Sequence, residues 1–359
     1  MPSGSSDLSS LVQHISSTAR SFALVHSTPG WPYPPPGADP PSSSSSRSNA
    51  RSDTTPSGST CPPLHIAILD SSFNPPTLAH QSIASSSNPP LYKYNFPSAT
   101  PTGVPRDITT NDVNNDNLYN EGTLRPTPTP TPTPTSTHPY TSRLLLFSAR
   151  NVEKTLKEGD TTPVQRLEMM SLLSETLRDL HPDEGVAVGL INEATFVGKA
   201  GIIRDWLVHQ HQRQNQRNQS RSETQSQIDL TFLIGTDTLV RVFDPRFYPP
   251  GEMESLLERL FTPSDRGGYG ATLVSARRGT EPSDRALEEE ILNRDGVKKW
   301  VVSGHVRILG AGSDGWEDVS STKVREAVKS DGQEGDDGGL IKMVGKDIGD
   351  YIKREGLYK

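Results

Sequence analysis

The sequence predicts an α/β domain, built on a parallel sheet flanked by helices. Two observations predict this class. Short apolar runs rich in β-prone residues end in turn residues, and segments with helical spacing of apolar residues alternate with them. Strands that alternate with helices form βαβ units, whose strands lie parallel in one sheet.

Low-complexity stretches divide the chain of 359 residues. Of its 31 prolines, 23 lie between Ser27 and Tyr140, together with serine runs and a Thr-Pro repeat. Such stretches carry too little apolar surface to offset the entropy of ordering. We therefore expect a disordered linker at 27–63 and a long disordered insertion at 86–141. The remainder supports a single folded domain at 64–358, which the insertion interrupts.

Composition excludes several classes of protein. A formal net charge of −7 argues against a general nucleic-acid surface, and the single cysteine, Cys61, excludes a disulfide framework and a cysteine zinc site. The chain has no apolar run of 18 residues and no continuous apolar stretch near its start, so we expect neither a membrane span nor a secretory signal. The expected location is cytoplasmic or nuclear, with no nucleic-acid or membrane partner.

The segment 1–26 is predicted to form an amphipathic helix ahead of the domain. Asp7 is placed to cap this helix, and seven apolar residues follow it at helical spacing. They are Leu8, Leu11, Val12, Ile15, Ala19, Phe22 and Ala23. We expect the helix to run from about Leu8 to His26 and to dock on the core or on a partner.

Within the domain, strands and helices are expected to alternate. The strands are expected at 64–69, 143–148, 186–191, 228–234, 271–275 and 306–309. The helices are expected at 77–85, 164–180, 196–209 and 320–329, followed by a last helix with an apolar face from Leu340 to Ile352. The first strand is a short apolar run, which is typical of a buried parallel strand.

The residues directly after the first expected strand carry the most specific pattern in the chain. Ser71-Ser-Phe-Asn-Pro-Pro-Thr-Leu-Ala-His80 reads as a turn, two prolines and the first turn of a helix. Ligands bind at the carboxyl ends of strands in an open α/β sheet, and a helix N-terminus offers free N–H groups to a phosphate. Thr77 and His80 are three residues apart, so both can face one phosphoryl oxygen. A lone Thr-x-x-His pair is, however, more typical of a capped helix with a half-buried histidine.

A second helix start with similar chemistry is expected about 240 residues later. Val319-Ser-Ser-Thr-Lys-Val-Arg325 places three hydroxyls and two cations in one helical turn. This pattern alone is typical of a capped surface helix.

Together the two motifs resemble the signature of the nucleotidylyltransferase superfamily, in its nicotinamide mononucleotide adenylyltransferase branch. The first resembles Gly-x-Phe-Asn-Pro-x-Thr-x-x-His, with Ser71 at the glycine position, and the second resembles Ile-Ser-Ser-Thr-x-Ile-Arg. The resemblance implies a Rossmann-like nucleotidylyltransferase fold and a divergent member of the family. The site residues that it implies are the catalytic His80, Thr77 and Arg325 and the phosphate-binding Ser71, Ser72, Phe73, Asn74, Ser320, Ser321 and Thr322.

Weaker matches to the same family lie between the two motifs. The loop after the 228–234 strand resembles Gly-Ala-Asp-Leu-Leu with threonine in place of alanine, and an Arg-x-Gly segment follows the next strand. These matches imply nucleotide contacts by Gly235, Thr236, Asp237 and Arg277 and phosphate contacts by Lys154 and Arg166. Lys154 can equally be a solvated charge. The chain also ends with a segment that resembles the family's Val-x-x-Tyr-Ile-x-x-x-x-Leu-Tyr.

The activity that the resemblance implies is adenylyl transfer from ATP, with Mg²⁺, to nicotinamide mononucleotide or nicotinate mononucleotide. In that reaction His80 donates to the α-phosphate while Arg325 and its neighbouring hydroxyls hold the departing pyrophosphate. No protein ligands for a metal are expected; His209 and His211 are two apart and do not share a helical face. Two alternatives stay open: a superfamily transferase with CTP or another phosphorylated acceptor, and a regulatory protein that binds or hydrolyses ATP. Protein partners of the insertion and the oligomeric state also stay open.

Overall fold

The computed structural model describes residues 5–33, 63–87, 140–149, 160–217, 227–276, 282–309, 319–330 and 337–359. Contacts divide the chain into two compact units, and all described residues belong to the one made of Met1–Tyr92 and Thr137–Lys359. Most of the expected linker, at 34–62, and most of the expected insertion, at 88–139, lie outside the described residues.

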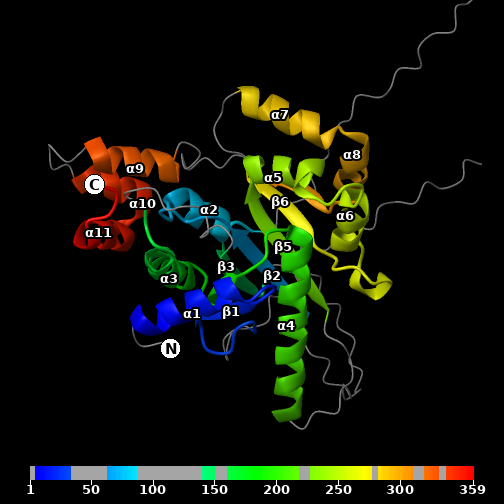
Figure 1. Cartoon of the computed structure of the whole chain (residues 1–359), viewed down its shortest axis with the longest axis horizontal. Helices are drawn as coiled ribbons and strands as arrows, with labels where there is room; N and C mark the ends of the chain where they lie inside the picture. The colour runs from blue at the N-terminus through cyan, green and yellow to red at the C-terminus, as the bar shows by residue number, and fades with distance from the viewer. Residues whose placement is uncertain are drawn as a thin grey trace, which may run out of the picture. The chain divides into compact units, whose positions relative to one another are not determined.

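A seven-stranded sheet in the order β1-β4-β3-β2-β5-β6-β7 forms the centre of this unit (Figure 1). Its strands are β1 (Phe22–Ser27), β2 (Leu64–Asp70), β3 (Ser142–Ser148), β4 (Gly185–Ile191), β5 (Ile228–Gly235), β6 (Thr272–Ala276) and β7 (Val306–Leu309). Strands β2 to β7 pair in parallel, and β1 pairs with β4 in the antiparallel direction. The predicted α/β class with a parallel sheet is therefore confirmed, with one antiparallel strand added at an edge.

Helices cover both faces of the sheet. They are α1 (Ser5–Ser17), α2 (Leu78–Ser85), α3 (Pro163–Leu180), α4 (Phe196–Arg217), α5 (Thr236–Val242), α6 (Met253–Phe261), α7 (Pro282–Leu292), α8 (Asp295–Val302), α9 (Ser321–Ser330), α10 (Asp337–Val344) and α11 (Lys346–Glu355). Helices α1, α2, α3, α10 and α11 share one hydrophobic cluster with Leu233 of β5. The neighbouring Phe232 points the other way and meets Phe196 of α4, with ring centroids 5.3 Å apart.

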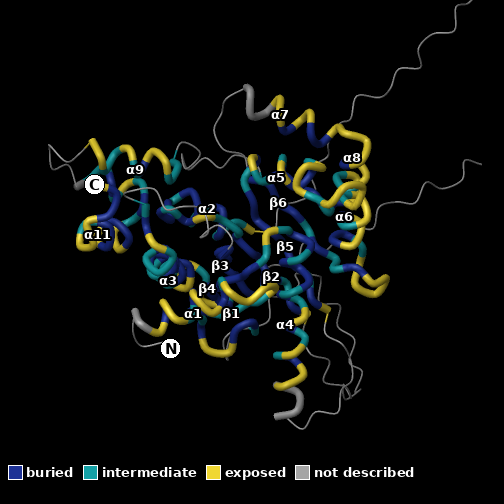
Figure 2. The backbone as a smooth tube through the Cα atoms, in the orientation of Figure 1, coloured by how far each residue is buried: buried dark blue, intermediate teal, exposed yellow. Residues whose placement is uncertain are grey.

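Burial follows this two-sided packing (Figure 2). Four consecutive residues of β3, Leu144 to Phe147, have no exposed surface. An unbroken apolar run is expected for a parallel strand that has helices on both faces, because successive side chains point to opposite faces. None of the helices among the described residues is long and apolar enough to cross a membrane.

The order of the strands creates a switch point beside β2. From β2 the chain proceeds outward through β3 to β4, then returns to place β5 on the other side of β2. Leu69 of β2 pairs with Leu233 of β5, so the loops that follow these two strands begin side by side. In open α/β sheets this crevice, outside the carboxyl ends of the strands, is where ligands bind.

The N-terminal segment corrects the expected helix over 1–26. Helix α1 ends at Ser17, where Asn192 Nδ2 donates to the carbonyl oxygens of Ser16 and Thr18, each at 3.0 Å. The chain then forms β1 at the edge of the sheet. Residues 28–33, expected in the linker, also pack on the domain: Trp31 is buried and its indole N–H donates to Arg143 O at 3.2 Å.

The C-terminal segment corrects the expected single last helix. Gly345 has φ +82°, a conformation outside the right-handed helical region, and it separates α10 from α11. The apolar residues of both helices still face one core, since Leu340, Val344, Ile348 and Ile352 all join the same cluster. Helices α5 to α8 were not expected from the sequence.

An ion pair between the buried Arg143 and the half-buried Glu184 fastens the amino-terminal ends of two neighbouring strands. Arg143, near the start of β3, places Nη2 3.0 Å and Nε 2.5 Å from the two carboxylate oxygens of Glu184, which directly precedes β4. Its Nη1 donates to the carbonyl oxygens of Ala84, at the end of α2, and Ser86, the latter at 3.1 Å. Arg143 therefore joins the chain before and after the expected insertion.

Replacing Arg143 by methionine tests this link. Arg143→Met removes the cation beside the half-buried Glu184 carboxylate and the donor to the carbonyl oxygens of Ala84 and Ser86, so the free energy of unfolding should fall by about 2–3 kcal/mol in urea titrations. Adding Glu184→Gln should recover part of the loss. The control is Arg178→Met, because Arg178 forms an exposed ion pair with Glu175 and should cost less than about 1 kcal/mol. Equal losses for both arginines would contradict the assignment.

Candidate functional site

His80 is held at the start of α2 by hydrogen bonds to both ring nitrogens. Its Nδ1 accepts from the backbone N–H of Thr77 at 3.1 Å and lies 2.9 Å from Thr77 Oγ1. Its Nε2 lies 2.9 Å from Ser71 Oγ. Because the backbone N–H can only donate, Nδ1 is the acceptor, and the neutral ring carries its proton on Nε2. Thr77, which the resemblance assigns to the site, turns its hydroxyl towards His80 and is almost fully buried.

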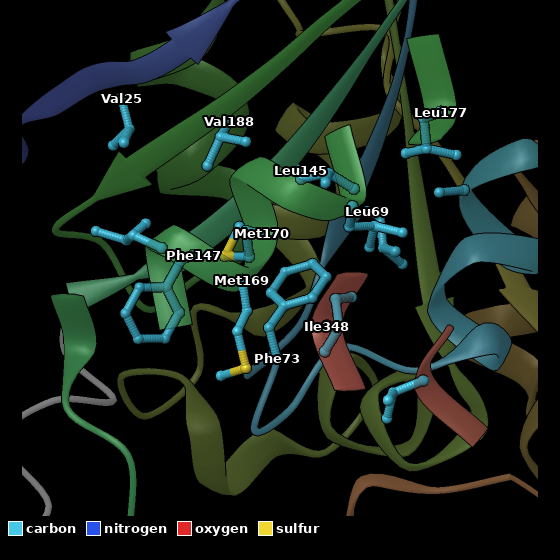
Figure 3. Close-up of a cluster of buried hydrophobic side chains, with 14 of the residues drawn as sticks. Val25, Leu69, Phe73, Leu145, Phe147, Met169, Met170, Leu177, Val188 and Ile348 are labelled. Atoms are coloured by element: carbon cyan, nitrogen blue, oxygen red, sulfur yellow. The ribbon is translucent and has the colours of Figure 1, made fainter. Parts of the chain in front are cut away.

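Phe73 anchors the loop between β2 and α2 in the core. It has φ +46°, and its side chain has no exposed surface. Its ring lies near Met169 and Ile348 in the close-up of the core (Figure 3) and 5.1 Å from the ring of His80. Phe73 therefore holds the loop in place, and its side chain is not available to a ligand.

The side chain of Asn74 connects this loop to two distant parts of the chain. Its Oδ1 accepts from Thr161 Oγ1 at 2.7 Å and from the Tyr358 hydroxyl at 2.9 Å. Its Nδ2 donates to Asp160 Oδ1 at 3.4 Å. The loop is thereby tied to the residues that precede α3 and to the C-terminus.

The two motifs singled out in the sequence meet at this loop. Arg325 Nη1 donates to Asn74 O at 2.6 Å, and Ser321 Oγ donates to Pro75 O at 2.8 Å. The starts of α2 and α9 therefore lie beside each other, although these bonds join residues 251 and 246 positions apart in the sequence. This proximity places two helix N-termini, with their hydroxyls and cations, on one side of the sheet.

The first turn of α9 presents further polar groups to solvent. The Ser320 hydroxyl accepts from the backbone N–H of Lys323 at 3.2 Å, and Thr322 Oγ1 accepts from Arg325 Nη2 at 3.2 Å. Thr322 and Lys323 are exposed, whereas Ser320 and Ser321 are half-buried. Of the implied phosphate-binding side chains, Ser72 is also exposed.

Two arginines near Asn74 are bound by neutral oxygen atoms. Arg166 is buried, and its Nε donates to Thr161 Oγ1 at 3.1 Å, while Arg325 donates to Asn74 O and Thr322 Oγ1. Burial lowers the pKa of Arg166 and the nearby Arg325 charge lowers it further, against the opposing effects of Tyr358 and Asp160. Neither guanidinium forms an ion pair with a carboxylate among the described residues, so an anion beside them would be stabilised.

The loop after β5 adds a buried hydroxyl without a partner. Gly235 precedes α5, Asp237 is exposed, and Thr236 is only 6% exposed. Thr236 Oγ1 has no hydrogen-bond partner within the described part of the chain. A buried polar group of this kind needs a partner from a ligand or a water molecule.

Sequence reasoning missed a buried ion pair next to Ser71. Lys199 Nζ, from α4, lies 2.5 Å from Asp70 Oδ2 at the end of β2, and the two side chains are 6% and 8% exposed. The available signal was weak: Asp70 is a charged residue that ends an apolar strand directly before the motif. The ion pair holds the start of the loop against the opposite face of the sheet from α2.

The remaining implied residues, Lys154 and Arg277, lie outside the described residues. Within the described ranges, no group of three or more His, Cys, Asp or Glu side chains could hold a metal ion.

Removing one partner of the Asp70–Lys199 pair should destabilise the fold. Lys199→Met leaves a buried carboxylate without its cation, so we expect a loss of about 3–5 kcal/mol in the free energy of unfolding. Pairing it with Asp70→Asn should restore much of this loss. Lys346→Met, which breaks an exposed ion pair with Asp350, serves as the control. If Lys199→Met is as stable as Lys346→Met, the buried Asp70 carboxylate does not depend on Lys199.

No model of a protein family and no curated protein sequence matches the chain. The comparison with solved structures finds matches, among them the nicotinic acid mononucleotide adenylyltransferase of Plasmodium falciparum complexed with APC. That match has a TM-score of 0.39 and 12% sequence identity, and it covers 82% of this chain and 97% of that one.

Proposed function

We propose that the chain is a nucleotidylyltransferase that transfers the adenylyl group of MgATP to nicotinamide mononucleotide or nicotinate mononucleotide. The observation that carries the proposal is the meeting of the α2 and α9 starts, joined by the bonds from Ser321 and Arg325 to the loop after β2. These are the two segments whose sequences resemble the family's phosphate motifs. They meet at the switch point of the sheet, where open α/β folds bind nucleotides.

The two helix starts offer complementary contacts to a polyphosphate. The backbone N–H groups of the first helical turn and the positive ends of the helix dipoles favour negative charge at both starts. The exposed Thr322 and Lys323, together with Arg325, suit the departing pyrophosphate from the α9 side. Arg166 adds a second guanidinium that is held by a neutral oxygen. Magnesium enters with ATP as part of the substrate, and its charge offsets that of the phosphates.

The reaction is an in-line displacement at the α-phosphorus. A phosphate oxygen of the mononucleotide forms the new bond, and the bond from the α-phosphorus to the bridging oxygen breaks. The electron pair of that bond leaves with pyrophosphate. Positioning and charge stabilisation dominate such transfers, so the protein needs no covalent intermediate. The His80–Ser71 pair would face the α-phosphate oxygens, where negative charge must be stabilised in the transition state.

The choice of a pyridine mononucleotide rests on the sequence resemblance. The features that favour it are the Asn74-Pro75-x-Thr77 form of the first motif and the ending with Tyr351-Ile352 and Leu357-Tyr358. The two features belong to one hydrogen-bond network, because Asn74 of the motif accepts a hydrogen bond from Tyr358 of the ending. A superfamily transferase with CTP or another phosphorylated acceptor would share the two phosphate motifs.

One observation favours a second candidate, a protein that binds or hydrolyses ATP without transfer. The Ser71 hydroxyl is hydrogen-bonded to His80 Nε2, the ring atom that would otherwise face the phosphate. Incubation with Mg²⁺, with either ATP or CTP labelled in the α-phosphate, and with each mononucleotide in turn separates the candidates. Labelled dinucleotide supports the proposal, and label transfer only from CTP supports the other transferase. Hydrolysis alone, or unchanged ATP, contradicts transfer.

Loss of the imidazole should impair transfer more than binding. His80→Ala should lower kcat by at least about 100-fold, because it removes a group aligned for the transition state, while the Kd for MgATP changes less. Initial rates of dinucleotide formation and calorimetric titration with MgATP measure the two effects. His209→Ala is the matched control, since His209 is exposed on α4 and bonded to the backbone of Asp205. An unimpaired His80→Ala enzyme would exclude His80 from catalysis.

A further inference from the structure

The Ser71 hydroxyl contacts His80 Nε2, and Ser71 is the more exposed of the two residues. His80 is 5% exposed, whereas Ser71 is half-buried and reaches the surface of the loop. Its Oγ lies 2.9 Å from His80 Nε2, and its backbone N–H donates to Leu146 O of the neighbouring strand at 3.4 Å. A ligand that approached this loop would therefore meet Ser71 before His80.

The hydrogen bonds around His80 have a defined direction. The Thr77 N–H donates to Nδ1, so Nε2 carries the ring proton and donates it to Ser71 Oγ. A hydroxyl that accepts in this way keeps its own proton free to donate to another group. The chain of bonds runs from the first turn of α2, through the imidazole, to the Ser71 hydroxyl. Each bond in such a chain polarises the next one.

We propose that the Ser71 hydroxyl, rather than the imidazole, is the group that donates to the α-phosphate oxygen. This inference rests on the proposed function and refines its chemistry. His80 then acts as a positioning residue: it orients and polarises Ser71 from behind. The step needs no proton transfer, because Ser71 keeps its proton in a hydrogen bond to the phosphate oxygen. Bond formation and cleavage at the α-phosphorus remain those of the in-line displacement.

The competing interpretation is that Ser71 merely blocks His80. The two interpretations predict opposite changes in the transfer rate when the hydroxyl is removed. If Ser71 is the donor, removal of its hydroxyl slows transfer. If Ser71 blocks the ring, the same change exposes Nε2 and raises the rate, most of all with glycine, the residue at this position in the motif that the sequence resembles. Neither Ser71→Ala nor Ser71→Gly introduces a group that needs new space.

Steady-state kinetics of the full-length chain decide between them. Ser71→Ala should lower kcat by about 100-fold, the usual loss for one such donor, while the KM for MgATP changes by less than about twofold. Ser71→Gly should behave in the same way. Ser255→Ala, which removes an exposed hydroxyl on α6, should leave the rate unchanged. An unchanged or raised kcat in either Ser71 variant overturns the proposal.

A double variant tests whether His80 acts through Ser71. Ser71→Ala with His80→Ala should be at most a few-fold slower than Ser71→Ala, on the order of threefold, because the imidazole has lost the group that it polarises. If the double variant loses the product of the two single-variant factors, the imidazole acts independently of Ser71. Nitrogen-15 NMR of the histidine rings supplies a readout besides activity: His80 should carry its proton on Nε2, and that signal should shift in Ser71→Ala. A ring protonated on Nδ1 would overturn the direction of the bonds.

These outcomes also separate this proposal from the proposed function. If the wild-type chain makes no dinucleotide with any mononucleotide, both fail. If it does so and Ser71→Ala is as fast as wild type, only the role of Ser71 fails.

Discussion

The amide of Asn74 is the group on which the geometry of the site depends. Its oxygen accepts from Thr161 and Tyr358, its nitrogen donates to Asp160, and its backbone carbonyl accepts from Arg325. Only an amide can accept and donate in this way, since a carboxylate would lose the donor and face Asp160 with like charge. Through this one residue, the loop after the central strand, the start of α3, the start of α9 and the C-terminus take fixed positions. Unsatisfied polar groups would remain in a buried place if any of these partners moved.

The sequence predicts most of the fold because the parallel strands are buried on both faces. Both faces of these strands are apolar, so each strand stands out in the sequence as an unbroken apolar run. The strands at 64–70, 142–148 and 185–191 were located to within one residue. The N-terminal segment was misassigned for a physical reason. The helical spacing of apolar residues continues through Phe22 and Ala23, but tertiary pairing overrides it: Phe22–Ser27 becomes a strand because β4 offers it an open edge. The C-terminal helix breaks at Gly345, whose positive φ is not visible in an apolar pattern.

The meeting of the two motif segments was predictable from the sequence, and the directions of their side chains were less so. A motif after the first strand and a second helix start far along the chain identified the segments that meet. The directions of their side chains follow from tertiary partners instead. Thr77 turns to His80, and Phe73 turns into the core, because each finds its contact there. The Asp70–Lys199 pair could not be found from the sequence, since each charge taken alone is ordinary and only the packing of α4 on β2 brings them together.

The arginines near the amino-terminal ends of the parallel strands and those near the carboxyl ends have different hydrogen-bond partners. At the amino-terminal edge, the two oxygens of the Glu184 carboxylate face Arg143. Such a pair offsets much of the cost of burying its charges and leaves little for a further ligand. At the carboxyl edge, Arg166 and Arg325 are held by a hydroxyl and a peptide carbonyl, which orient the guanidinium groups without neutralising them. Burial lowers the pKa of Arg166, and the nearby Arg325 charge lowers it further, so an anion placed near both arginines would offset part of this cost. In the proposed reaction the phosphates of the substrate would supply this anion, since their charge offsets that of the two guanidinium groups.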